Sequence, residues 1–338
     1  MTVEGVAALV VAVGFAFMLG VSDAPNASAA LIAARATSYR GAVGFALVAH
    51  VAGGLLAGQA VARTMVGLVH VTPAQVAATY LAGGIASIGF TLVATRRGIP
   101  VSASIGLVGG LVGAAVVLGG WQAVGWGGLH GGRPYGVIGT LAAIAVSPVL
   151  GAGVAALARR GLAPLARRAT RRSLHPLRGL IWLAAGLVGL ADGSNDGQKA
   201  MGLVTGLLLA AGVIPVFAVP FWVTALVAVV LAVGTAAGGQ RIIRTVSSRF
   251  YRGGPLDGLA AQAASALTIL GAGYLGAPVS TSTVVASGMV GVGAARRRRH
   301  VRWATVSSVV TAWIVTVPAC ALVGAGLAGA DRLLGGGR

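Results

Sequence analysis

Charged residues are scarce in this chain. Only 9% of its 338 residues are Asp, Glu, Lys or Arg, whereas about 25% is typical of a soluble domain, so an ordinary cytosolic enzyme is excluded. An apolar content of 57% excludes disorder. Aromatic residues make up 5%, and the alternating ten-residue pattern of an outer-membrane barrel is missing. The composition therefore predicts an all-α polytopic membrane protein rather than an enzyme.

Cysteine and acidic residues are also scarce, which narrows the class of protein further. The chain has one cysteine, Cys320, which excludes a disulfide framework and a cysteine-rich metal centre. It has six acidic residues against 25 basic ones, among which Lys199 is the one lysine. In a soluble protein this excess would indicate nucleic-acid binding. Here the arginines lie between apolar segments, so we interpret them as topology anchors beside membrane lipid and expect no nucleic-acid partner.

Apolar segments recur along the whole chain. They cover residues 3–36, 41–62, 75–119, 134–158, 179–212, 215–238, 256–295 and 303–330. Two of the longest are interrupted by polar runs, around Asp23 and Asp196. Two others exceed the roughly 20 residues of one crossing and are interrupted near the middle by Pro-Val-Ser, at Pro100 and Pro278. We therefore predict two broken helices at the polar runs and two re-entrant hairpins with their tips at Pro-Val-Ser.

The same order occurs in both halves: broken span, plain span, hairpin, last span. Each half then has three full crossings and one hairpin, and an odd number of crossings inverts the second half relative to the first. The predicted fold is two inverted-topology repeats, residues 1–158 and 179–338. A basic cytoplasmic linker at 159–178 joins them.

The arginines predict the orientation. With the N-terminus outside, eighteen arginines fall in inner loops and four fall outside, which agrees with the positive-inside rule. We therefore expect a multi-pass protein of a cell membrane of the bacterial inner-membrane type. The basic inner loops are suited to receive a cytoplasmic regulatory protein, and the sequence leaves a homodimer open.

Ionisable residues inside apolar segments predict the site. Asp23, Asp192, Asp196 and Lys199 all lie in the two polar runs, and a charge at membrane depth costs about 2.5–3.5 kcal/mol. Such residues are retained where they bind a substrate or ion, relay a proton or form an ion pair. Oxygen ligands suit Na⁺, so we predict that Asp23, Asn26, Asn195 and Asp196 serve ion coupling, with Asp23, Asn26 and Asp196 as the Na⁺ ligands. A purely structural Asp–Lys pair is the alternative.

Hydroxyl residues follow each Pro-Val-Ser. Each run would start the second arm of its hairpin, and a hydroxyl cluster at a helix N-terminus is suited to an oxyanion. Carboxylates beside such a site would repel the anion unless a cation enters as well, which is the logic of a symporter. The predicted substrate-binding residues are Ser102, Ser104, Ser280, Thr281, Ser282 and Lys199.

These motifs resemble those of the inorganic phosphate transporter (PiT) family. Residues 22–27 (Ser-Asp-Ala-Pro-Asn-Ala) and 194–202 are similar to its paired Asn-Asp signatures, and residues 100–104 and 276–282 to its Pro-Val-Ser-Thr-Thr-His motifs. The resemblance implies inverted repeats and secondary transport of inorganic phosphate by alternating access, coupled to Na⁺ or H⁺, without a cofactor. This sequence departs from the family's motifs at four positions, Ser22, Ala103, Ile105 and Thr283. These changes bear on which substrate is bound and how tightly.

Several alternatives stay open. A sulfate permease or a metal-phosphate permease would use the same fold, and an anion channel is less favoured because hairpins from opposite sides suit alternating access. An intramembrane aspartyl protease would leave the hydroxyl hairpins unexplained. Lys199 lies opposite Asn26 in the repeat alignment, so its ammonium either replaces a bound cation or contacts the anion. For His50, in the second span, we weigh a proton relay against a helix–helix hydrogen bond.

Overall fold

The computed structural model describes residues 2–34, 36–97, 101–130, 133–164, 174–238, 254–296, 301 and 303–334. These residues confirm the all-α class. The helices are α1 (Val3–Ala33), α2 (Tyr39–Leu55), α3 (Ala60–Val66), α4 (Pro73–Arg96), α5 (Ala103–Gly119), α6 (Gly136–Gly161), α8 (Leu174–Ala210), α9 (Phe221–Ala237), α11 (Pro255–Tyr274), α12 (Thr281–Arg296) and α13 (Trp303–Leu333). A 3-10 turn, η1 (Trp121–Ala123), and an antiparallel pair, β1 (Gly128–His130) with β2 (Arg133–Tyr135), lie between α5 and α6. The strands were not predicted.

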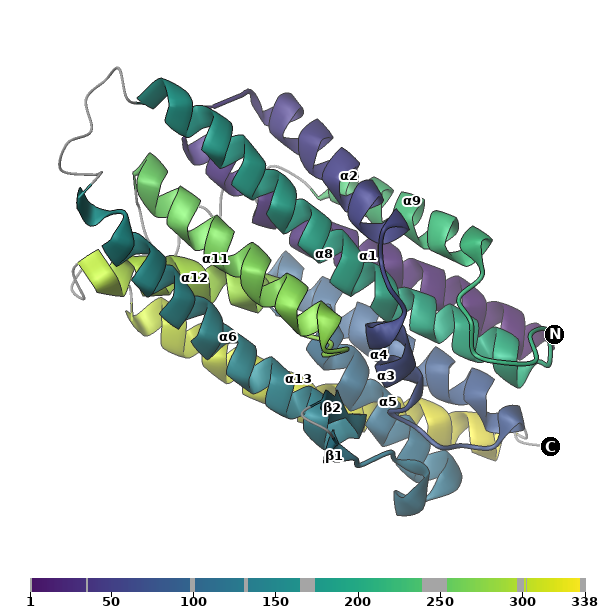
Figure 1. The fold of residues 1–338 in the computed structure, drawn as a ribbon. Helices are drawn as coiled ribbons and strands as arrows, with labels where there is room; N and C mark the ends of the chain where they lie inside the picture. The colour runs from purple at the N-terminus through teal and green to yellow at the C-terminus, as the bar shows by residue number, and fades with distance from the viewer. Residues whose placement is uncertain are drawn as a thin grey trace.

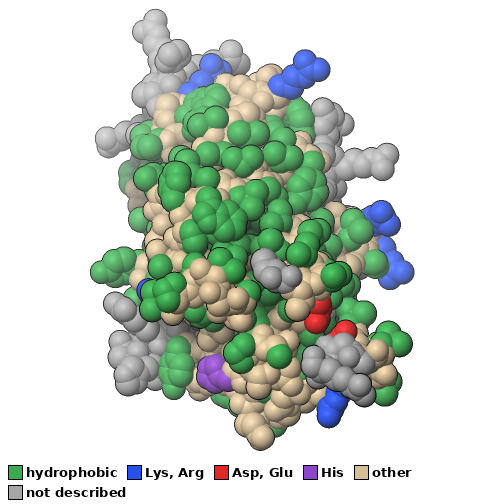
Figure 2. Space-filling view, turned by 90° about the vertical axis from the view of Figure 1, so that its right-hand side faces the viewer, with side chains coloured by type: hydrophobic (Ala, Val, Ile, Leu, Met, Phe, Trp, Pro, Cys, Tyr) green, Lys and Arg blue, Asp and Glu red, His purple; other side chains and the backbone are tan. Residues whose placement is uncertain are grey.

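Several helices are long and apolar enough to cross a membrane. Within the described residues they are Val3–Ile32, Pro73–Arg96, Gly136–Gly161 and Val310–Leu333, joined by α2 and α3 if this bent pair forms one span. Figure 2 shows a face over which apolar side chains are spread, with the Lys and Arg side chains at its margins. The chain is therefore a multi-pass membrane protein, as its composition predicts.

The prediction that the two polar runs break their helices is wrong. Both α1 and α8 are continuous through these runs, although α1 contains Pro25. Neighbouring polar groups support the turn around the proline, because Ser28 donates to the carbonyl of Ala24 and Gln262 of α11 donates to that of Asn26 at 3.0 Å. Pro25 lacks an N–H and so leaves the carbonyl of Val21 without its helical donor, while these side-chain bonds reinforce the helix at Ala24 and Asn26.

The break that the structure does show lies in a segment predicted to be plain. The apolar segment 41–62 contains α2 and the seven-residue α3, whose axes differ by 75°. Residues 56–59 separate the two helices and include Gly58, where a side chain would meet open space. The second segment is therefore bent, and its last part is a short helix with one buried face, formed by Val61, Ala62 and Met65.

Both predicted hairpins have their break at Pro-Val-Ser. In the first, α4 ends at Arg96 and α5 begins at Ala103, although Pro100 itself lies outside the described residues. In the second, α11 ends at Tyr274 and α12 begins at Thr281. The two arms of each hairpin pack on one another. The hairpins enter from opposite ends of the molecule and their tips lie near its middle (Figure 1).

Helix packing follows a paired pattern. Helix α2 of the first half packs on α8 of the second, and correspondingly α9 of the second half packs on α1 of the first. Helix α5 of the first hairpin packs on α13 of the second half, and correspondingly α12 of the second hairpin packs on α6 of the first half. In Figure 1, α1 and α8 run in opposite directions. This is the arrangement that an inverted duplication predicts. The helices reach into the predicted linker from both sides, since α6 ends at Gly161 and α8 begins at Leu174; residues 165–173 lie outside the described part of the chain.

Small residues bring the first hairpin close to α13. A Cβ added at Gly109 would lie 2.4 Å from the carbonyl oxygen of Val317, and one at Gly113 would lie 1.9 Å from that of Ala321. The two helices therefore pack closely along this glycine face, because neither position has room for a side chain.

A buried charge cluster fixes the base of the second hairpin. Asp257, in the first turn of α11, pairs with Arg159 at the end of α6 and, at 3.0 Å, with Arg296 at the end of α12. It also accepts a hydrogen bond from the backbone N–H of Gly254. One carboxylate therefore joins both arms of the hairpin to a helix of the other half.

We expect Asp257→Asn to destabilise the protein by on the order of 3 kcal/mol, because removing one partner leaves a largely buried arginine uncompensated. Thermal unfolding in detergent measures the effect as a lower Tm. Asp331→Asn is the matched control, since Asp331 makes neither an ion pair nor a hydrogen bond among the described residues. Equal Tm values for the two variants would contradict the expectation.

Candidate functional site

Lys199 lies where the tips of both hairpins meet α8. Its ammonium donates to Oδ1 of Asp196 at 2.5 Å, to Oγ of Ser104 at 2.9 Å and to the carbonyl of Val279. The side chain is fully buried. An ammonium has three N–H donors, and here each has an acceptor, in α8, in the first hairpin and in the second. Lys199 is thus a fixed cation between the two halves.

The two aspartates of the polar runs each bind a hydroxyl of the second hairpin. Oδ2 of Asp196 accepts from Thr281 at 3.0 Å, and Oδ1 of Asp23 accepts from Ser282 and, at 3.0 Å, from the amide of Asn26. Both carboxylates are almost fully buried. The structure therefore brings residues predicted from separate motifs into one buried site.

Three predicted residues have other arrangements. Ser102 caps α5, since its Oγ accepts from the N–H of Ile105 at 3.4 Å. Asn195 donates to the carbonyl of Ala277 at 3.1 Å, which leaves its Oδ1 buried without a partner among the described residues. The Oγ of Ser280 is likewise buried and unpartnered there. An orphaned amide oxygen suits a cation, and an orphaned hydroxyl suits an oxyanion.

Acidic side chains outnumber basic ones in this site. Asp23 lies close enough to Asp196 and Asp192 for electrostatic repulsion, and Lys199 is paired with Asp196. The described residues hold no group of three or more His, Cys, Asp or Glu side chains that fits a metal ion. The polar groups around Asp23 are carboxylate, amide and hydroxyl oxygens, the kind of donor that hard cations prefer.

Sequence reasoning missed a second polar cluster beside this site. Nδ1 of His50 is 2.7 Å from Oγ1 of Thr235, and its Nε2 is 3.8 Å from Oδ2 of Asp192. The three side chains join α2, α9 and α8 and are buried. Asp192, one of only six acidic residues, was a signal for this cluster, but nothing in the sequence paired it with His50.

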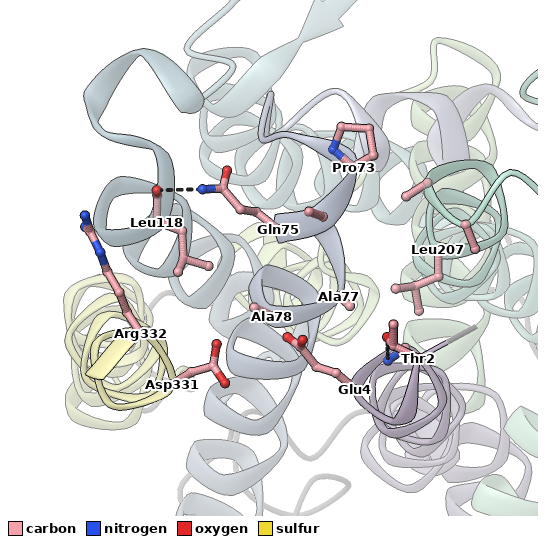
Figure 3. A pocket seen from close by; sticks show the side chains of 14 residues that line it. Thr2, Glu4, Pro73, Gln75, Ala77, Ala78, Leu118, Leu207, Asp331 and Arg332 are labelled. Atoms are coloured by element: carbon pink, nitrogen blue, oxygen red, sulfur yellow. Dashed lines mark hydrogen bonds between the residues drawn. The ribbon is translucent and has the colours of Figure 1, made fainter. Parts of the chain in front are cut away.

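Cavities lie beside the site and away from it. One of about 270 Å³ is lined by Asn195 and Gln198 of α8, Gly58 of the α2–α3 bend and Tyr274 of α11. Another, of about 530 Å³, lies near both chain ends, where Glu4 of α1 and Asp331 of α13 extend into it (Figure 3). None of the predicted site residues lines the second cavity.

The chain is similar in sequence to known proteins over most of its length. The profile of the phosphate transporter family matches residues 19–175 and 161–324. The chain belongs to the phosphate transporter family. This confirms the family that the Asn-Asp and Pro-Val-Ser motifs indicate.

Individual members of this family match over most of their length. A probable low-affinity inorganic phosphate transporter of Rhizobium meliloti is 36% identical over 94% of this chain and 93% of its own. A protein of the same description from Bacillus subtilis is 29% identical, over 94% of each chain. These relatives are transporters by name rather than enzymes.

A solved structure described as the sodium-dependent phosphate transporter superposes with a TM-score of 0.84. It covers 98% of this chain and all of its own, at 23% sequence identity. At this identity the likeness establishes the fold. The helices of the phosphate transporter family and their connections are thus shared by this chain.

Proposed function

We propose that the protein transports inorganic phosphate across the membrane by cation-coupled symport. The observation that carries the proposal is the site between the hairpin tips. There the hydroxyls of Thr281 and Ser282 in the second hairpin donate to buried carboxylates, and the hydroxyl of Ser104 in the first hairpin accepts from Lys199. Membership of the phosphate transporter family supports the substrate. Phosphate can also donate a proton to a carboxylate, whereas sulfate cannot, which favours phosphate at a site with several aspartates.

The charges of the site explain why an anion would need a cation. Asp23, Asp192 and Asp196 are opposed by one fixed ammonium. An oxyanion entering this low-dielectric region would be repelled, and burial of an unpaired charge is costly. A cation bound by Asp23, Asn26 and Asp196, or a proton on a carboxylate, removes the repulsion and couples the two fluxes. The name of the structural relative favours Na⁺.

We propose that Ser104, Ser280, Thr281 and Ser282 bind the phosphate oxygens. In the described conformation Thr281 and Ser282 donate to Asp196 and Asp23. A cation on these carboxylates would compete for the same oxygens and release the hydroxyls toward the anion. Ser102 would act through the N-terminus of α5 that it caps. If the cation binds first and releases these hydroxyls, the affinity for phosphate depends on the cation.

The proposed membrane arrangement is a pair of inverted repeats, residues 1–158 and 179–338, with the N-terminus outside. The start of α8 and the ends of α6 and α12 gather at one end of the molecule, opposite both chain termini (Figure 1). This end is next to the basic linker 159–178, and the positive-inside rule places it in the cytoplasm. A homodimer and a cytoplasmic regulator remain open partners.

Uptake of radiolabelled phosphate into proteoliposomes tests the function, with Na⁺ and H⁺ gradients imposed separately. We expect uptake driven by one of the gradients and strongly reduced in Thr281→Val and Ser282→Ala, which lose the hydroxyls. Ser307→Ala is the control, because this exposed serine bonds only to its own helix among the described residues. Uptake that needs neither gradient would contradict symport. Uptake of labelled sulfate but not of phosphate would identify the protein as a sulfate permease, the alternative considered above.

A further inference from the structure

Helix α3 covers the tip of the second hairpin. The hydroxyl of Thr64 donates to the carbonyl of Gly276 at 2.7 Å. Gly276 has φ of +73°, and a Cβ there would lie 3.3 Å from the carbonyl oxygen of Ala60. Figure 1 shows α3 directly beyond the end of α11. The helix thus lies between the hairpin tip and the end of the molecule that holds both chain termini.

The inner face of α3 is fastened to α8. The backbone N–H groups in the first turn of a helix have no partner within that helix. In α3 the N-cap residue, Gln59, makes no side-chain bond to them. Instead, the N–H of Val61 donates to Oε1 of Gln198 at 3.0 Å. The backbones are also close, since a Cβ at Gly202 would lie 2.8 Å from the carbonyl oxygen of Ala62.

Gln198 lies on the turn of α8 that carries the site. It precedes Lys199 directly and follows Asn195 by three residues, so all three share one helical turn. The orphaned Oδ1 of Asn195 and the ammonium of Lys199 therefore lie on the same stretch of α8 as the side chain that holds α3. The bond between Gln198 and Val61 fastens α3 directly beside the site.

The bend before α3 has room to move. The cavity of about 270 Å³ lies against Gly58 and Ala60 on one side and against Asn195 and Gln198 on the other. A side chain at Gly58 would meet open space. Close-packed surfaces resist movement, whereas here the tight contacts of α3 lie on its inner face and the space lies at its hinge.

We propose that Gln198 is a positioning residue that holds α3 closed over residues 195–202 of α8, and that α3 swings at residues 56–59 to open the site toward the end of the molecule with the chain termini. The proposal rests on the transport function above and adds the moving element to it. Opening breaks the two hydrogen bonds described, from Val61 to Gln198 and from Thr64 to Gly276.

Thiol labelling of the purified protein in detergent tests the closure without transport. Cys320→Ser removes the one native cysteine, and Ala62→Cys then places a thiol on the buried face of α3. In the absence of phosphate we expect Gln198→Met to speed maleimide labelling about fivefold, because one buried hydrogen bond is lost. Gln198→Glu keeps an acceptor for Val61 and should keep labelling slow. Thr64→Val should speed it independently.

Two comparisons make the result decisive. Labelling of Ala114→Cys, on the buried face of α5, should not respond to Gln198→Met, because a general loosening would raise both rates. Equal labelling of Ala62→Cys with glutamine, methionine or glutamate at position 198 would overturn the proposal. Phosphate uptake is measured separately: a protein that carries no phosphate but shows the labelling difference would refute the transport function and leave the closure standing.

Discussion

Asp196→Asn is expected to lower phosphate uptake to the level of empty liposomes and to lower the stability of the protein as well. The carboxylate binds the ammonium of Lys199 at 2.5 Å and the hydroxyl of Thr281 at 3.0 Å. An amide cannot compensate the buried ammonium, and breaking a buried pair costs about 3–5 kcal/mol. It also removes one of the carboxylates proposed to hold the coupling cation. Uptake in proteoliposomes and Tm in detergent measure the two effects.

The double variant Asp196→Asn/Lys199→Gln separates stability from transport. Removing both members of a buried ion pair leaves no uncompensated charge, so we expect most of the lost Tm to return. Uptake should stay absent, because neither the carboxylate nor the ammonium is restored. If uptake returned together with Tm, the pair would only tie the helices together, which is the structural alternative to a binding role.

The sequence predicts which polar residues gather between the hairpin tips, because these residues break the rules of a membrane segment. Asp23, Asp196 and Lys199 are costly at membrane depth, and the Pro-Val-Ser motifs mark the hairpin tips. The polar runs and the Pro-Val-Ser motifs therefore find residues that the fold brings together from four separate segments. The partners of each residue were less predictable. That Lys199 would bond Ser104 as well as Asp196 depends on how the two hairpins meet.

Local signals misplaced the breaks in the helices. The polar runs around Asp23 and Asp196 suggested unwound turns, but α1 and α8 pass through them. At Gly193 a Cβ would lie 2.2 Å from the carbonyl oxygen of His50, so this glycine permits close packing rather than a break. The actual bend, between α2 and α3, depends on contacts with α8 and the second hairpin that are distant in sequence.

Lys199→Asn is expected to make phosphate uptake depend on one additional cation. In the first half, Asn26 follows Asp23 by three residues and donates to it at 3.0 Å. In the second half, Lys199 holds the matching position after Asp196 and supplies a fixed positive charge. Replacing it with asparagine gives both halves the same pair of oxygen ligands. The charge lost from the protein must then be supplied by Na⁺ or H⁺ before the anion can bind.

The ratio of cation to phosphate taken up, measured with labelled ions under each gradient, tests this expectation. Lys199→Gln should show the same gain, because it also removes the charge, whereas Arg160→Gln, at the exposed end of α6, should leave the ratio unchanged. An unchanged ratio in both Lys199 variants would mean that the ammonium does not take the place of a coupling cation. Its role would then be to contact the anion directly, and the affinity for phosphate should fall in both variants instead.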